Sequence, residues 1–220
     1  MYFIAHRGYP NLKYKDNSFE AYNNAINNDF HLIEMDIQLC KSGEIILYHD
    51  IYLKNRLIQD IHYDEIKKYD IKTLRDFFDN IYKQNMKLLF DIKGGHDNLI
   101  VDKILILCNK YNVNYNNIYM SSFNKRIIEK LIEYKKVYNY TLGLISDNNF
   151  YYDEIKYQLN KIDFISINFE MFLICDKELI NECKNQEIKI FIWTIKNENQ
   201  YELIKNFNNI DGIISDIKLS

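Results

Sequence analysis

The sequence predicts an α/β fold in which short strands alternate with helices through a single domain. The chain has 220 residues, a length that suits one α/β domain. Eight short apolar runs rich in β-branched residues recur along it, as expected of strands buried on both faces. Amphipathic segments separate most of these runs. That alternation favours a TIM (β/α)8 barrel that spans residues 1–220.

The predicted strands leave room for a helix between most neighbours. They cover residues 2–5, 32–37, 87–92, 117–120, 138–145, 163–167, 188–193 and 210–215. The segments with a helical period include NSFEAYNNAINN, where Phe19, Tyr22 and Ile26 share one face, and also DNLIVDKILILCNKY, NKRIIEKLIEYKK and NENQYELIKNF. A doubly wound open sheet is the alternative architecture, but it usually has fewer strands at this length.

The segment after the second strand, IQLCKSGEIILYHD, departs from this alternation. Ser42-Gly43 is a turn signal, and a second apolar run covers residues 45–48. We expect a hairpin or extended excursion that ends at His49-Asp50 and folds back over the barrel mouth. Residues 51–86 follow with one predicted helix, TLRDFFDNIYKQ.

Charge and cysteine content exclude several classes of partner. The 31 Asp and Glu against 28 Lys and Arg give a net charge of −3, with no basic stripe, so nucleic acid is not the expected partner. The four cysteines form no Cys-x-x-Cys pair, which is typical of reduced thiols in a cytoplasmic protein. No signal peptide is visible, and no apolar run approaches the ~18 residues of a membrane span.

Two carboxylates on the second strand are the first candidates for chemistry. Glu34 and Asp36 are two residues apart, so their side chains share one face of the strand. Because unpaired buried charge is very costly, something must balance them. A divalent cation such as Mg²⁺ or Ca²⁺ would do so, and salt bridges to Lys or Arg would do so equally well.

The third strand ends in LLFDIKGG, where Asp91 and Lys93 also share a face. Asp91 would complete a cation site with three carboxylates, and Lys93 would place a positive charge at the same mouth. An ordinary surface ion pair between Asp91 and Lys93 is the alternative that spacing favours.

Histidines end two of the strand-like runs. His6 and Arg7 follow the first strand, and His49 ends the excursion after the second. In α/β folds the turns that follow strands hold the catalytic groups. Because imidazole titrates near neutrality, this pair suggests a general acid and a general base. The other histidines, of which His96 follows Gly94-Gly95 at the same face, are weaker candidates.

Taken together, these residues resemble the glycerophosphodiester phosphodiesterase family. The motifs IAHRG, DNSFEAYNNAI, IEMDIQLCKSGEIILYHD, LLFDIK, YMSSFN and FIWTIKN…DGIISD occur in the family's order, from Ile4 to Asp216. The resemblance implies a TIM barrel and metal-dependent hydrolysis of a small-molecule glycerophosphodiester to sn-glycerol 3-phosphate and an alcohol.

The resemblance also implies roles for individual residues. It makes His6 and His49 the acid–base pair and Glu34 and Asp36 metal ligands. It assigns phosphate binding to Arg7 and Lys93, a position next to the site to Asn17, and the substrate end of the pocket to Trp193. Tyr48 and Phe123 are further candidates for contact with the alcohol.

Two departures from the family pattern bear on the reaction. The usual Pro-Glu-Asn-Thr reads Lys15-Asp16-Asn17-Ser18, and the usual Glu-x-Lys reads Asp91-Ile92-Lys93. Asp-x-Lys also occurs in the related sphingomyelinase D-like phospholipases, so a phospholipase D-like enzyme that forms a cyclic phosphate is the alternative reaction. A catalytically weak barrel that binds phosphodiesters is a further alternative, although the complete set of charged groups argues against it.

Overall fold

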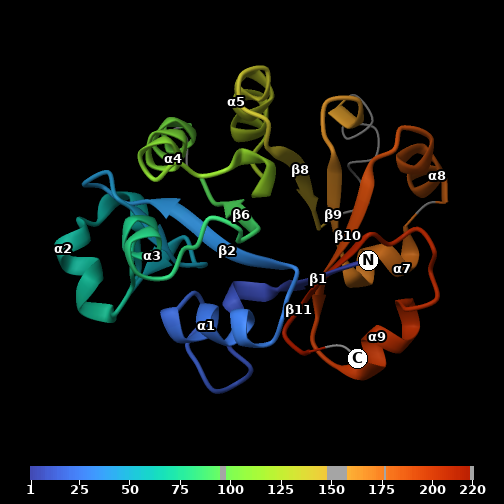
Figure 1. Ribbon diagram of the computed structural model, residues 1–220, viewed down its shortest axis with the longest axis horizontal. Coiled ribbons are helices and arrows are strands. Elements are labelled where there is room, and N and C mark those ends of the chain that lie inside the picture. Colours follow the sequence, from blue (N-terminus) through green and yellow to red (C-terminus); the bar gives the residue numbers. More distant parts are fainter. Residues whose placement is uncertain (95–97, 148–157, 176, 219–220) are drawn as a thin grey trace.

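Eight parallel strands curl into a closed barrel, and helices surround it (Figure 1). The structure is a computed structural model that describes residues 1–94, 98–147, 158–175 and 177–218. The strand order is β1-β11-β10-β9-β8-β7-β6-β2, and the barrel closes because β1 also pairs with β2. The predicted TIM barrel is therefore confirmed, and the open-sheet alternative is wrong.

All eight predicted strands are present, with ends that shift by a few residues. The barrel strands are β1 (Tyr2–Ala5), β2 (Leu32–Leu39), β6 (Leu88–Ile92), β7 (Ile118–Ser122), β8 (Thr141–Ser146), β9 (Phe164–Asn168), β10 (Lys189–Ile195) and β11 (Gly212–Ser215). The α-helices among the described residues are α1 (Phe19–Asn27), α2 (Tyr63–Ile66), α3 (Leu74–Asn80), α4 (Leu99–Lys110), α5 (Lys125–Lys135), α7 (Phe169–Ile174), α8 (Lys177–Asn185) and α9 (Glu198–Ile204).

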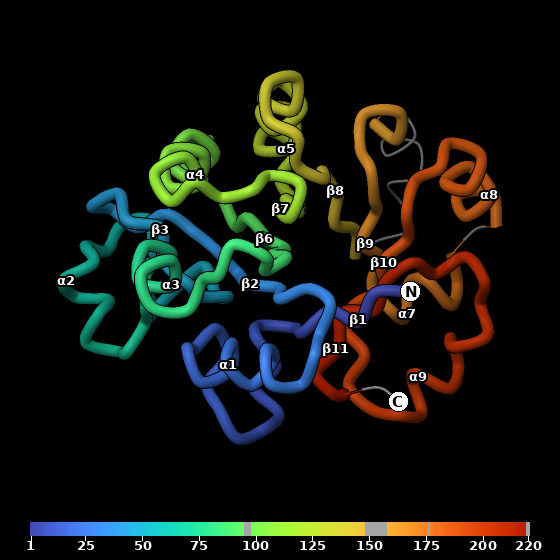
Figure 2. The backbone as a smooth tube through the Cα atoms, in the orientation of Figure 1, coloured from blue at the N-terminus to red at the C-terminus, as the bar shows by residue number. Residues whose placement is uncertain are grey.

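The two ends of the chain meet in the barrel wall. Figure 2 shows the first strand, in blue, beside the last strand, in red. The pairing register places Ala5 opposite Ser215. The residues that follow these two, His6 and Asp216, therefore emerge side by side at the carboxyl end of the barrel.

Side chains inside the barrel form an apolar layer below this end. Because successive side chains on a strand point to opposite faces, every second residue enters the interior. The interior cluster consists of Ile4, Leu32, Leu89, Tyr119, Phe164, Phe191 and Ile214. Gly143 on β8 leaves room for one of these rings, since a Cβ there would lie 2.1 Å from Phe164 Cζ. The alternate side chains pack outward against the helices.

The excursion after β2 is the predicted hairpin. Strand β3 (Ile45–Leu47) runs antiparallel to β2, and Ile37 pairs with Leu47. The region from 51 to 86 holds more than the one expected helix. It contains α3, but also a ribbon of β4 (Tyr52–Leu53) and β5 (Arg56–Leu57) and the helix α2. The three unexpected elements, β4, β5 and α2, have two to four residues each, too few to produce a periodic apolar pattern.

Cys40, Cys108 and Cys183 are buried in the protein core. Among the described residues, no helix is both long enough and apolar enough to cross a membrane.

Candidate active site

Polar side chains occupy the interior positions one step beyond the apolar layer. The pairs are two residues apart along a strand: Ile4 with His6, Leu32 with Glu34, Leu89 with Asp91, and Ile214 with Asp216. A cavity of about 110 Å³ lies at the carboxyl ends of the strands. Its lining includes three of these polar residues, His6, Glu34 and Asp91, and also Arg7, Asp36, His49 and Lys93. The alternation that builds the barrel core therefore also builds this site.

Three carboxylates meet in the cavity. Glu34, Asp36 and Asp91 each offer an oxygen, and these oxygens lie within 4.8 Å of one another. Pairing of β2 with β6 puts Asp36 directly opposite Asp91. Glu34 is 4% exposed and Asp36 is 2% exposed. The three carboxylates therefore lie together, with Glu34 and Asp36 almost fully removed from solvent and the Asp91 side chain 13% exposed.

Two cations partly balance these carboxylates. Lys93 Nζ lies 2.5 Å from Asp91 Oδ2 and 3.1 Å from Asp36 Oδ1. Arg7 Nε lies 3.4 Å from Asp36 Oδ2, and its Nη1 donates to Asp16 at 2.7 Å. The pair of Asp91 and Lys93 is thus part of the cavity wall and not a surface ion pair.

Glu34 has the least compensation of the three. Its Oε2 accepts a hydrogen bond from the Arg7 backbone N–H at 2.6 Å. Burial, together with the nearby charges of Asp36 and Asp91, raises the pKa of Glu34 well above its ordinary value. Burial acts in the same direction on Asp36, but Lys93, Arg7 and a hydrogen bond from Asn17 outweigh it and lower the pKa of Asp36.

The donor set fits a hard divalent cation. Asp91 Oδ1 is buried and, within the described part of the chain, accepts no hydrogen bond. A buried carboxylate oxygen without a partner is unfavourable. Burial and the neighbouring carboxylates likewise disfavour the charged form of Glu34. Oxygen ligands of this kind suit Mg²⁺ or Ca²⁺ better than the softer transition metals.

Asn17 lies behind Asp36, where it is 4% exposed. Its Nδ2 donates to Asp36 Oδ2 at 2.9 Å, and its Oδ1 accepts the backbone N–H of Asp36 at 3.0 Å. The buried Tyr22 hydroxyl donates to the same Oδ1 at 3.2 Å. Asn17 therefore lies next to the cavity, and its side chain holds a carboxylate of the cluster.

Both predicted catalytic histidines line the cavity. His6 Nδ1 lies 2.6 Å from Asp216 Oδ1, and His49 Nδ1 lies 2.8 Å from Asp50 Oδ1. The His6 side chain is 16% exposed, whereas that of His49 is 42% exposed. The site therefore contains one sheltered and one open imidazole.

The remaining histidines contribute nothing to this cavity as far as the structure describes it. His31 precedes β2 at the opposite end of the barrel, where its Nδ1 accepts the Phe3 backbone N–H at 3.0 Å. His62 precedes α2. His96 lies outside the described residues.

Aromatic side chains form one wall of the mouth. Trp193 lies within β10, and its Nε1 donates to the Ser166 carbonyl at 3.2 Å. Phe123 meets Trp193 edge to face with ring centroids 5.7 Å apart, and Lys93 Nζ lies 5.6 Å from the Phe123 centroid. Tyr48, the third aromatic candidate, packs instead against the small core of the hairpin region.

Sequence reasoning did not identify the partners of these residues. His6 contacts Asp216, and Arg7 contacts Asp16. Asn17 contacts Tyr22. A signal for Asp216 was available. It stands two residues after the interior Ile214, and closure of a barrel by its first and last strands brings such a residue beside His6.

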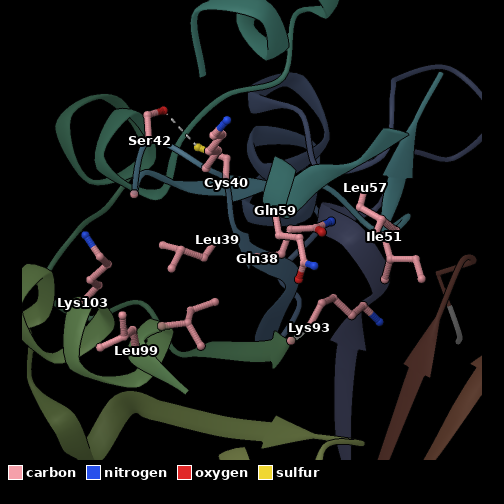
Figure 3. A pocket seen from close by; sticks show the side chains of 14 residues that line it. Gln38, Leu39, Cys40, Ser42, Ile51, Leu57, Gln59, Lys93, Leu99 and Lys103 are labelled. Carbon is pink, nitrogen blue, oxygen red and sulfur yellow. Dashed lines mark hydrogen bonds between the residues drawn. The ribbon is translucent and has the colours of Figure 1, made fainter. Parts of the chain in front are cut away.

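A larger groove of about 520 Å³ lies outside the barrel mouth, between the hairpin turn and α4 (Figure 3). It shares Lys93 with the cavity. Figure 3 shows the terminal nitrogen of Lys93 pointing away from Leu99 and Lys103. That nitrogen is held by Asp36 and Asp91, and the described side chains that line the groove include no carboxylate. As far as the structure describes it, the groove therefore differs in chemistry from the cavity.

The fold and the cavity define a TIM-barrel protein whose mouth is suited to a cation and a small anion, as catalysis on a phosphate ester requires. The model of the glycerophosphoryl diester phosphodiesterase family matches residues 6–217. The chain therefore belongs to this family of phosphoric diester hydrolases.

Individual proteins are similar to this chain over nearly their whole length. A curated glycerophosphodiester phosphodiesterase of Caldanaerobacter subterraneus subsp. tengcongensis is 27% identical over 97% of this chain and 93% of its own length. The solved glycerophosphodiester phosphodiesterase of Thermotoga maritima is 23% identical, with a TM-score of 0.77 over 98% of this chain and 94% of that one. An Oleispira antarctica phosphodiesterase, solved with the product sn-glycerol-3-phosphate, has a TM-score of 0.80 at 18% identity over 98% of this chain and 93% of that one.

Proposed function

We propose that this protein hydrolyses small glycerophosphodiesters to sn-glycerol 3-phosphate and an alcohol, in a reaction that depends on Mg²⁺ or Ca²⁺. The family assignment supports the reaction, and the product bound to the Oleispira antarctica relative supports the glycerol 3-phosphate half of the substrate. The observation that carries the proposal is the meeting of three carboxylates, two fixed cations and two histidines around one cavity.

Glu34, Asp36 and Asp91 would hold the cation. When bound, the cation neutralises phosphate charge and acts as a Lewis acid on the phosphoryl group. Arg7 and Lys93 would hold the phosphate oxygens and stabilise the negative charge that builds up as phosphorus becomes five-coordinate. Asn17 would keep Asp36 in place, and Trp193 and Phe123 would contact the organic part of the substrate.

His6 and His49 would move the protons. One imidazole accepts the proton of the attacking hydroxyl, and the other donates a proton to the oxygen of the departing alcohol. General acid–base catalysis of this kind contributes typically about 10²–10⁴-fold to a rate. The attacking hydroxyl is that of water or the 2-hydroxyl of the glycerol, which would give a cyclic phosphate first.

The test is product analysis with glycerophosphocholine in the presence of Mg²⁺, of Ca²⁺ and of a chelator. We expect glycerol 3-phosphate and choline only when a metal ion is present. A cyclic phosphate as the sole end product would favour the phospholipase D-like alternative that the Asp-x-Lys motif suggests.

Variants separate catalysis from simple binding. His6→Gln and His49→Gln should each lower kcat by about 10²-fold or more, while phosphate binding is retained. A kcat within a few-fold of the wild-type value in either variant would contradict the acid–base assignment. Absence of turnover with every head group and metal would favour the alternative of a catalytically weak barrel that binds phosphodiesters. The cytoplasmic location remains a prediction.

A further inference from the structure

Asp216 is the partner of the more sheltered histidine, and the fold explains how they meet. Ala5 and Ser215 are opposite one another in the pairing of β1 with β11, so the next residues leave adjacent strands together. His6 Nδ1 and Asp216 Oδ1 are 2.6 Å apart although 210 positions separate them in sequence. The Asp216 backbone N–H donates to the Ile195 carbonyl at 2.9 Å, which anchors the residue to β10 as well.

This contact determines which nitrogen of His6 carries the proton. An ionised carboxylate can only accept hydrogen bonds, so Nδ1 must be the N–H donor. In the neutral ring Nε2 is then left with a lone pair. His6 itself lines the cavity with the carboxylates and Lys93. In its neutral form, a histidine held in this way is prepared to take a proton at Nε2.

The second histidine is held much less firmly. Asp50 is its neighbour in sequence, and the side chains of His49 and Asp50 are 42% and 51% exposed. Water competes for such a contact and solvent screens it. For His6 and Asp216 the exposed fractions are 16% and 35%. The hydrogen bond to Nδ1 is thus sheltered from solvent in His6 and open to it in His49.

We propose that Asp216 is a positioning residue that makes His6 the general base of the reaction. This inference rests on the proposed function. His6 Nε2 takes the proton of the attacking hydroxyl while its oxygen bonds to phosphorus. The bond from phosphorus to the alcohol oxygen breaks with its electron pair, and His49 supplies a proton to that oxygen. Asp216 keeps Nδ1 protonated throughout and stabilises the imidazolium that forms.

Nuclear magnetic resonance tests the placement without substrate. Protein with ¹⁵N-labelled histidine is compared with Asp216→Ala at about pH 8.5, above the ordinary histidine pKa of about 6.5, and His6→Gln identifies the His6 signals. We expect the wild-type His6 to show a protonated Nδ1 and an unprotonated Nε2. In Asp216→Ala the two nitrogens should show exchange between tautomers.

Kinetics test the consequence. Asp216→Ala should lower kcat by about 10²-fold with KM within threefold, because the interaction matters in the transition state and not in substrate binding. Asp216→Asn, which keeps the shape and removes the charge, should lower kcat by about tenfold or more. If Asp216→Ala does not fold, Asp216→Asn carries the kinetic test.

The matched control is Asp211→Ala at the other end of the same strand. Asp211 Oδ2 accepts the Ile190 backbone N–H at 2.9 Å, so this change removes a structural contact far from the cavity. It should leave the His6 tautomer unchanged and kcat within threefold of wild type.

Two results would overturn the inference. One is an unchanged His6 tautomer in Asp216→Ala, and the other is a kcat that stays within threefold in both Asp216 variants. If the wild-type protein turned over no glycerophosphodiester, the proposed function would fail, but the tautomer measurement would still decide whether Asp216 fixes His6.

Discussion

Asn17 holds Asp36 at two points, with its amide nitrogen 2.9 Å from the carboxylate and its amide oxygen 3.0 Å from the backbone nitrogen. Tyr22, fully buried behind it, completes a chain of hydrogen bonds that leads from α1 to the acidic cluster. The geometry of the site therefore depends on a residue that does not line the cavity.

Removal of this clamp should destabilise the protein. Asn17→Ala leaves the Asp36 amide and the Tyr22 hydroxyl without their partner, and each unsatisfied buried group costs about 1–3 kcal/mol. The Asp36 carboxylate keeps its contacts with Lys93 and Arg7. We expect urea denaturation to show a loss of roughly 2–4 kcal/mol in unfolding free energy. Tyr22→Phe, which removes one hydrogen bond, should cost only about 1 kcal/mol. A loss below about 0.5 kcal/mol in Asn17→Ala would show that the clamp is unimportant for stability.

Cation binding should be visible as thermal stabilisation. A ligand at about 100 times its Kd stabilises the folded state by about 2.7 kcal/mol, which is about 5–10 °C in Tm for a domain of this size. Mg²⁺ or Ca²⁺ should produce this shift in the wild-type protein but not in Glu34→Gln or Asp91→Asn. The control Glu20→Gln changes an exposed acid on α1 and should retain the shift. Equal shifts in all four proteins would rule out the cluster as the metal site.

Trp193 should report substrate or product binding by its fluorescence. It is the only tryptophan of the chain and lines the cavity, where it contacts Phe123. Titration with glycerol 3-phosphate in the presence of metal should change the emission and saturate, whereas glycerol alone should not. Phe123→Leu should weaken the apparent affinity by a few-fold, since it removes an aromatic contact. A flat titration at concentrations that inhibit turnover would place the ligand away from Trp193.

An ion pair between two outer helices should make stability depend on pH. Asp102 on α4 accepts from Lys130 Nζ at 2.5 Å and from the Tyr134 hydroxyl at 2.6 Å, both on α5. Partial burial acts to raise the pKa of Asp102, but these hydrogen bonds outweigh it and lower that pKa. The pKa of Asp102 is thus lower in the folded protein than in the unfolded chain, where it is about 3.9. The ionised Asp102 therefore stabilises the folded state above that pH, and this stabilisation is lost as the pH falls through the folded-state pKa.

Asp102→Asn should therefore be less stable than the wild type near neutral pH, and the difference should vanish in acid below the folded-state pKa of Asp102. Urea denaturation across this range measures it. Glu129→Gln, a change of an exposed acid on α5, serves as the control and should show no such trend. A difference that persists unchanged in acid would mean that packing, and not the ion pair, is responsible.

The parts of this fold that were predictable depend on local spacing. Apolar runs revealed the barrel strands, and the two-residue period on β2 put Glu34 and Asp36 on one face. The paired histidines were found because they follow strand-like runs. In each case the signal lies within about ten residues of sequence.

The rest depends on contacts that local spacing does not encode. His6 and Asp216 meet only because the barrel closes, and the amide of Asn17 turns toward Asp36 only once α1 packs on the strands. The helix α2 has four residues, and tertiary packing of Ile66 rather than periodicity maintains it. Long-range partners of predicted residues were therefore the part that was missed.

Closure of the barrel by β1 and β11 also sets the order in which the protein can mature. Strand β1 is synthesised before β11 and keeps one open edge until β11 has been made. His6 is synthesised early but gains its carboxylate partner only with residue 216. A nascent chain, or one cut short by a nonsense mutation before Gly212, would therefore have an unsealed barrel and an unpaired His6, whatever the state of its other strands.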